Sequence, residues 1–157
     1  MSDEFQNQDP MNPILRNILA VIVGAAVAMV VNDLVGSIGG KFLPIPEGID
    51  PNDLESIKAN IDLYTPIHFI APFLAHALGT LGGAIVACLL ATSHRMTLAM
   101  IVSGFHFMGG ITMCYLLSFQ PLSFSLLDLA FAYFPMAYIG VKIVERFKKK
   151  EVKQSGL

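Results

Sequence analysis

Charged side chains are scarce in this chain. Only 14% of its 157 residues are Asp, Glu, Lys or Arg, whereas about 25% is usual in soluble domains. The chain is 54% hydrophobic, and its apolar residues fall in four blocks of about 20 residues, the length that crosses about 30 Å of hydrocarbon. The composition excludes an ordinary soluble domain and predicts an integral membrane protein, with residues 1–157 as a single transmembrane domain.

Cysteine is nearly absent, and so are several familiar motifs. Cys88 and Cys114 fall toward opposite ends of adjacent predicted helices, too far apart for a disulfide, and they are interpreted as small apolar residues. The sequence has no phosphate-binding glycine loop, zinc-finger spacing or nucleic-acid footprint. No nucleophile has identifiable oxyanion donors and an acidic partner. Enzyme activity is therefore the least favoured class, and nucleic acid is not an expected partner.

The predicted fold class is all-α, an integral membrane four-helix bundle. Its spans are expected at about residues 14–36, 66–91, 96–117 and 126–144. Thr65 caps the second span and Pro66 begins it, and Ser125 and Asp128 occupy capping-box positions for the fourth. The link TSHR is so short that the second and third helices must be antiparallel neighbours. The first span is expected to be retained, because the acidic segment before it is unlike a signal peptide.

The connection at residues 37–65 contains a candidate helix of its own. In "DPNDLESIKANIDLY" Asp50 suits an N-cap and Pro51 the first helical position. Leu54, Ile57 and Ile61 share one face at helical spacing. The segment therefore predicts a short amphipathic helix in an outer loop, lying on the membrane surface or over the mouth of the bundle.

Lysine and arginine fix the expected orientation. They flank the first span, occupy the link between the second and third, and follow the fourth, at Arg16, Arg95, Lys142, Arg146, Lys148, Lys149 and Lys150. Basic residues of short flanks stay in the cytoplasm. Both termini are therefore predicted to be cytoplasmic, and the loop at residues 37–65 lies outside.

Small residues recur at every fourth position of the second span. They are Ala71, Ala75, Gly79, Gly83, Ala87 and Ala91, and the first span carries Ala20, Gly24, Ala28, Asn32 and Gly36. In lipid, helices associate where small residues let their backbones approach. Two interpretations stay open, which are tight packing within one chain and the seam of a homodimer.

Five ionisable side chains lie within the expected spans. They are Asp33, His68, His76, His106 and Asp128. Such groups are costly in a bilayer, so each is a site candidate. Helical rise places Asp33, His68 and Asp128 in an outer layer. It places His76 and His106 near the midplane, and a pocket reaching inward from the outer face would join the two layers.

Each of these side chains also has a structural interpretation. Asp128 completes a capping box, His68 is solvated at the interface, and Asp33 pairs with His68 or Lys41. Interhelical hydrogen bonds would join His76 and His106 to each other or to Thr80, Ser103 or Thr112. As a site, the group would relay protons, hold a metal ion, ligate a b-type haem through the two histidines, or bind a ligand head group. The metal and the cofactor stay open.

Three segments carry a family resemblance. "AHALGTLGGA" (75–84), "MGGI" (108–111) and "DLAFAYFPMAYIG" (128–140) resemble an uncharacterised family of small four-helix bacterial inner-membrane proteins. The resemblance covers the second to fourth helices. It implies a bacterial inner-membrane location and brings no activity, cofactor or substrate.

Two functions from different classes follow. The first is a small multi-pass membrane protein whose outward-facing His/Asp pocket binds or conducts a small ligand, a metal ion or a proton. The second is a structural or accessory subunit of a larger membrane complex. Alanine at His76 or Asp33 would abolish the first function with folding intact, whereas the second would depend on the lipid-facing surface or the loop helix.

Overall fold

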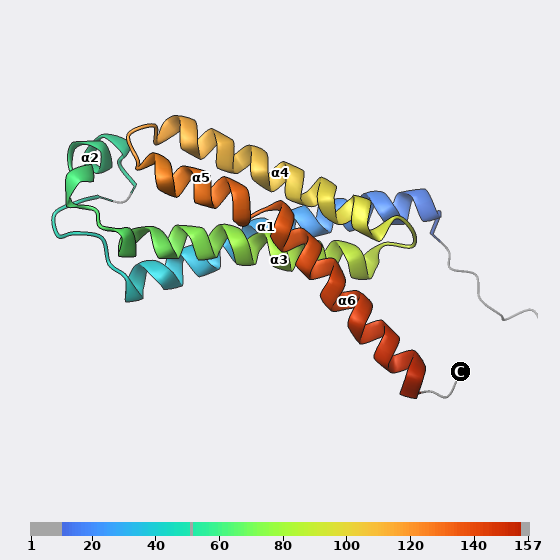
Figure 1. Ribbon diagram of the computed structural model, residues 1–157. Helices are drawn as coiled ribbons and strands as arrows, with labels where there is room; N and C mark the ends of the chain where they lie inside the picture. The colour runs from blue at the N-terminus through green and yellow to red at the C-terminus, as the bar shows by residue number, and fades with distance from the viewer. Residues whose placement is uncertain (1–10, 51, 155–157) are drawn as a thin grey trace, which may run out of the picture.

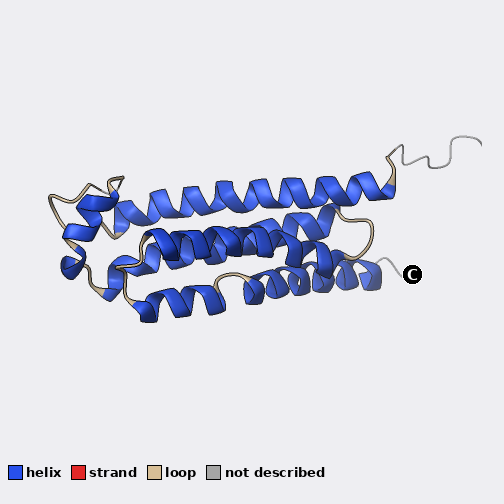
Figure 2. Ribbon diagram, turned by 90° about the horizontal axis from the view of Figure 1, so that it is seen from above, coloured by secondary structure: helices blue, strands red, loops and turns tan. Residues whose placement is uncertain are grey.

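The computed structural model describes residues 11–50 and 52–154, with only the backbone described for 151–154. Within these residues the chain is helical and contains no strand, and its long helices lie side by side in an elongated bundle (Figures 1 and 2). Four helical segments of the described chain are long and apolar enough to cross a membrane: Pro13–Phe42, Pro66–Leu90, Arg95–Leu116 and Leu122–Lys150. The predicted all-α class with four apolar helical segments is confirmed.

Helix α1 (Pro13–Phe42) is longer than predicted. It begins where the Asn12 side chain accepts a hydrogen bond from the N–H of Ile14 at 2.8 Å, and it continues to Phe42 instead of ending near residue 36. Gly39 near its end serves packing, because a Cβ at this position would lie 2.6 Å from Cβ of Ala71. Asp33 lies about 14 Å before the end of the helix at 1.5 Å per residue, whereas an end near residue 36 would place it about one turn from the end.

The connection between α1 and the second span, which the sequence predicts to be the outer connection, contains the expected short helix, but its boundary differs. Helix α2 (Leu54–Ala59) is capped by Asp53, whose side chain accepts from the N–H of Glu55 at 3.0 Å, and the one-turn helix η1 (Ile61–Leu63) follows. The expectation of Asp50 as cap is wrong, because its carboxylate accepts from the N–H of Asn52 at 2.9 Å instead. The predicted role of Pro51 lies outside the described residues.

The second and third spans are close to their predicted bounds. The turn η2 (Pro66–Phe69) leads into α3 (Ile70–Leu90), and α4 (Arg95–Leu116) returns beside it. Asn17 of α1 holds the link between them, since its Oδ1 accepts from the N–H of Thr92 at 3.0 Å and its Nδ2 donates to Ser93 Oγ at 2.9 Å. These bonds fix the start of α1 against the α3–α4 turn.

The fourth span is broken, which the sequence analysis missed. Helix α5 (Leu122–Phe131) ends before α6 (Phe134–Gln154) begins at an angle to it (Figure 1). Pro135 explains the break, because proline cannot donate a backbone hydrogen bond and its ring clashes with the preceding turn. The expectation that Asp128 completes a cap at the start of this helix is wrong, since it lies inside α5 and is buried at 2% exposure.

The small residues of α3 lie against α1. A Cβ at Gly83 would lie 2.5 Å from the carbonyl oxygen of Gly24, and a Cβ at Gly79 would lie 2.7 Å from that of Ala28. Such distances bring the two backbones into direct contact, as expected where small residues face each other. This side of α3 is therefore covered within the chain, and a homodimer would need another surface.

Candidate functional site

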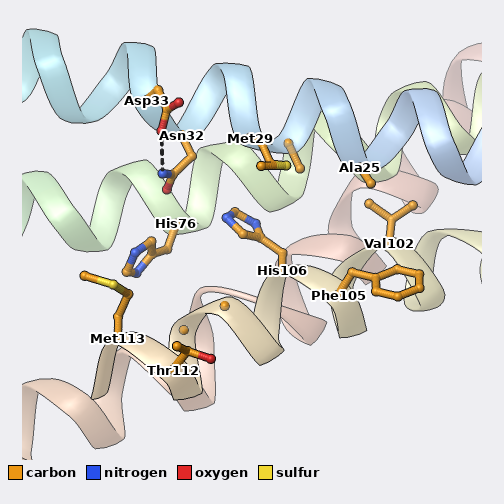
Figure 3. Close-up of a pocket in the computed structure, with 13 residues that line it drawn as sticks. Ala25, Met29, Asn32, Asp33, His76, Val102, Phe105, His106, Thr112 and Met113 are labelled. Atoms are coloured by element: carbon orange, nitrogen blue, oxygen red, sulfur yellow. Dashed lines mark hydrogen bonds between the residues drawn. The ribbon is translucent and has the colours of Figure 1, made fainter. Parts of the chain in front are cut away.

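A pocket of about 420 Å³ lies between α1, α3 and α4 (Figure 3). Most of its wall is apolar. Its polar and titratable lining residues are Asn32, Asp33, His76, His106 and Thr112. Lining residues on both α1 and α4 are exposed, with Met29 at 64% and Phe105 at 64%. The mouth therefore opens sideways between these two helices.

A buried carboxylate anchors His76. The Nδ1 atom of His76 lies 2.9 Å from Oδ1 and 2.9 Å from Oδ2 of Asp128. Tyr133 donates its hydroxyl to Oδ2 at 3.1 Å, and Tyr133 is fully buried. A carboxylate accepts and cannot donate, so Nδ1 of His76 carries the proton of this bond. When Nδ1 carries the only ring proton, Nε2 is a hydrogen-bond acceptor or a metal ligand.

His106 is held in the same manner by Thr80. The Thr80 hydroxyl donates to the carbonyl oxygen of His76 at 2.8 Å, and its oxygen lies 2.9 Å from Nδ1 of His106. A hydroxyl has one proton, which the carbonyl contact uses. Nδ1 of His106 therefore donates to Thr80, and its Nε2 is also an acceptor. Two imidazoles, each held through Nδ1 by a polar partner, thus line one pocket.

Aromatic packing fixes both rings. The centroids of His76 and His106 are 6.1 Å apart, with ring planes at 84°. Tyr133 stacks on His76 at 5.7 Å and meets His106 edge-on at 5.5 Å. One buried tyrosine therefore holds both histidines and also donates to Asp128. Rings held on several sides keep their orientation without a ligand, as a pre-formed site requires.

The α1 wall faces the histidines with an amide and a carboxylate. Asn32 lies across the pocket from His76 and His106 (Figure 3), and its Nδ2 donates to Oδ1 of Asp33 at 3.4 Å. The Oδ1 atom of Asn32 is buried, with no hydrogen-bond partner among the described residues. Buried polar atoms without a partner are uncommon in proteins. An unused acceptor thus points into the site opposite two imidazoles.

Four of the five predicted residues come together, in a different arrangement from the one expected. Asp33, His76 and His106 line the pocket, and Asp128, which does not line it, contacts Nδ1 of His76. The two-layer arrangement is wrong, because Asp128 touches His76 directly. His68 lies apart, where its Nδ1 accepts from the backbone N–H of Thr65 at 2.9 Å. It closes the first turn of η2 and contributes nothing to this site.

The cluster offers a metal ion few ligands. Among the described residues, no three His, Cys, Asp or Glu side chains are close enough to hold a metal ion. Structural zinc takes four protein ligands and catalytic zinc takes three. The two histidine Nε2 atoms are fewer ligands than either kind of zinc site requires, so the site favours hydrogen bonding over metal coordination.

Tyr133 is the site residue that the sequence analysis missed. The predicted span at residues 126–144 places Tyr133 inside a continuous helix, although Pro135, two positions later, indicates a break. The break turns Tyr133 into the core, where its hydroxyl reaches Asp128. No family model, curated protein or solved structure matches this chain. The site is therefore interpreted from its own geometry.

Proposed function

We propose that this chain is a multi-pass protein of the bacterial inner membrane, with both termini in the cytoplasm, and that its pocket binds a small amphipathic ligand. The observation that carries the proposal is the pair of oriented imidazoles, His76 on buried Asp128 and His106 on Thr80, facing the unpartnered Asn32 oxygen. Four apolar helical segments and the basic residues at one end of the bundle support the membrane location.

The pocket's shape favours an amphipathic ligand. Its rim carries the exposed Met29 and Phe105, whereas three of its hydrogen-bonding side chains are half-buried. They are Asn32, His76 and His106. In a bilayer, a mouth between α1 and α4 faces acyl chains, so a ligand enters from the lipid. Its polar head would donate to the histidine Nε2 atoms and to the Asn32 oxygen, and its apolar part would remain at the rim. Proton transfer through His76 and Asp128 is compatible with the same geometry.

Co-purification tests the proposal. The wild-type chain and a His106→Gln variant are extracted in discs of native lipid, and their bound small molecules are compared by mass spectrometry. We expect a molecule that the wild type retains and the variant loses, with Tyr115→Phe as control because Tyr115 is 82% exposed on the same helix. Identical profiles for the wild type and His106→Gln would refute ligand binding here.

Elemental analysis of the same samples tests for a metal ion, and proton flux into liposomes tests for a relay.

A second function, as an accessory subunit of a larger membrane complex, has its own supporting observation. A Cβ at Gly104, which does not line the pocket, would meet nothing within 4 Å, so α4 presents a small residue on an open surface where a partner helix fits. Leucine at Gly104 would then reduce the size of the complex on native gels and leave the pocket unaffected. Under the first function, the same substitution changes neither complex size nor ligand.

A further inference from the structure

A second hollow, of about 360 Å³, lies at the opposite end of the bundle from the outer connection. It is bounded by the end of α3, the start of α4 and the second half of α6. Its lining residues are Cys88, Arg95, Val144, Glu145, Lys148 and Lys149. The helix α6 leaves the bundle at an angle in this region (Figure 1). The hollow thus occupies the angle between α6 and the α3–α4 turn.

The charge of this hollow is strongly positive. It has three cationic side chains, from Arg95, Lys148 and Lys149, and one carboxylate, from Glu145. That carboxylate is already paired, since its Oε2 lies 2.8 Å from Nζ of Lys142. Among the described residues, the hydrogen bond of the Arg95 guanidinium is a long one, from Nε to the carbonyl oxygen of Ala91 at 3.5 Å, and Glu145 is close enough to interact with it electrostatically. Its remaining N–H groups are available to an anion.

The start of α4 adds to this positive potential. Arg95 is the first residue of the helix, and His94 before it, at φ 50°, provides no side-chain cap. An uncapped helix start carries partial positive charge on its free N–H groups. The helix start and Arg95 therefore both favour a negatively charged ligand.

Apolar surface lies beside the hollow. Leu89 and Leu90 at the end of α3 are 49% and 39% exposed, and Phe147 of α6 is 64% exposed. A ligand with a charged head and hydrocarbon tails matches this combination. A free phosphate ion would use the cations alone.

We propose that this hollow binds a phosphate group, and specifically the head group of an anionic phospholipid. Basic pockets at the cytoplasmic ends of membrane helices are suited to such head groups. Arginine pairs with phosphate through two parallel N–H bonds, whereas lysines act as mobile point charges around it. The site is separate from the pocket near His76, so it stands whether or not that pocket binds a ligand.

The test uses the full chain in neutral detergent, with three probes: inorganic phosphate, phosphatidylglycerol and phosphatidylcholine. Binding is read by native mass spectrometry and by the shift in thermal unfolding. The variants are Arg95→Gln and the double variant Lys148→Gln/Lys149→Gln. The matched control is Arg146→Gln/Lys150→Gln, which removes the same charge from exposed positions of α6 outside the hollow.

We expect the wild type to retain phosphatidylglycerol and not phosphatidylcholine. Arg95→Gln should weaken retention about fivefold and the double variant roughly twentyfold, while the control binds as the wild type does. If inorganic phosphate alone gives the same stabilisation and the same variant pattern, the phosphate site stands and its occupant is a soluble phosphate. Equal losses in the control and in the double variant, or no binding of either phosphate probe, would overturn the proposal.

Discussion

The Nδ1 atom of His76 lies 2.9 Å from both carboxylate oxygens of Asp128, a residue 52 positions later in the chain. This contact joins α3 to the short helix α5. It depends on the break after α5, because the break brings Tyr133 inward to donate to the same carboxylate. One buried acid thus organises residues from two helices and the turn that follows.

Removing this acid should destabilise the fold. Asp128→Ala leaves the Tyr133 hydroxyl and the His76 Nδ1 without their acceptor in a buried place, at a cost of roughly 1–3 kcal/mol for a group left unsatisfied. Thermal unfolding in detergent should show a lower midpoint. Asp62→Ala removes the same charge from an exposed turn and should leave the midpoint unchanged. An equal fall in both variants would contradict the role assigned to Asp128.

Two adjacent glycines of α4 should respond differently to alanine. A Cβ at Gly110 would occupy the place of the Tyr133 hydroxyl, whereas one at Gly109 would meet nothing within 4 Å. Gly110→Ala should therefore displace Tyr133 from Asp128, lower stability and change the bound-molecule profile. Gly109→Ala should match the wild type in unfolding midpoint. The reverse order would show that Tyr133 does not occupy this position.

The seam between α1 and α3 gives a second matched pair. A Cβ at Gly83 would lie 2.5 Å from the Gly24 carbonyl oxygen, and one at Gly82 would make ordinary contact with Val31 at 3.5 Å. Gly83→Ala should cost about 1–3 kcal/mol through overpacking. Gly82→Ala should be neutral or stabilising by up to about 1 kcal/mol, because alanine favours helix. Urea or SDS titration of the two variants measures this difference, and equal stabilities would argue against close backbone contact.

The topology predicts which positions a thiol reagent reaches from each side. In a chain with Cys88 and Cys114 replaced by alanine, single cysteines are placed at Glu55 of α2 and at Ser93 of the α3–α4 turn, both exposed positions. A membrane-impermeant maleimide applied to intact cells should label position 55 and spare position 93. Labelling of position 93 should appear once the membrane is opened. The opposite pattern would invert the proposed orientation.

The sequence predicted the spans better than the contacts between them. Helix bounds follow from apolar length and from local caps such as Thr65 and Pro66, which are encoded within a few residues. The break before Pro135 was also encoded locally, yet the long apolar run around it favoured a single span. The end of α1 lies beyond the predicted residue 36, because Gly39 packs against Ala71 within the helix.

The site could be predicted only in part, because the contacts between its residues depend on how the helices are placed relative to one another. The cost of an ionisable group in a bilayer singles out His76 and His106 in the sequence, and their positions on adjacent antiparallel helices predict a similar depth. The depth of a residue along a helix does not indicate the side of the neighbouring helices that its side chain contacts. The partnership of His76 with Asp128 depends on the path of α5, and the separation of His68 depends on its bond to Thr65. Neither is visible in residue spacing.

The interruption at Ala132 and Tyr133 divides the last apolar segment into two helices, α5 and α6, joined end to end. Helix α5 holds Asp128 against His76, and α6 carries the lysines at the other end of the molecule. A change in the angle between these helices would occur at residues 132 and 133, where the Tyr133 ring packs against both histidine rings. Such a change in the angle between α5 and α6 would therefore alter the packing around the two imidazoles.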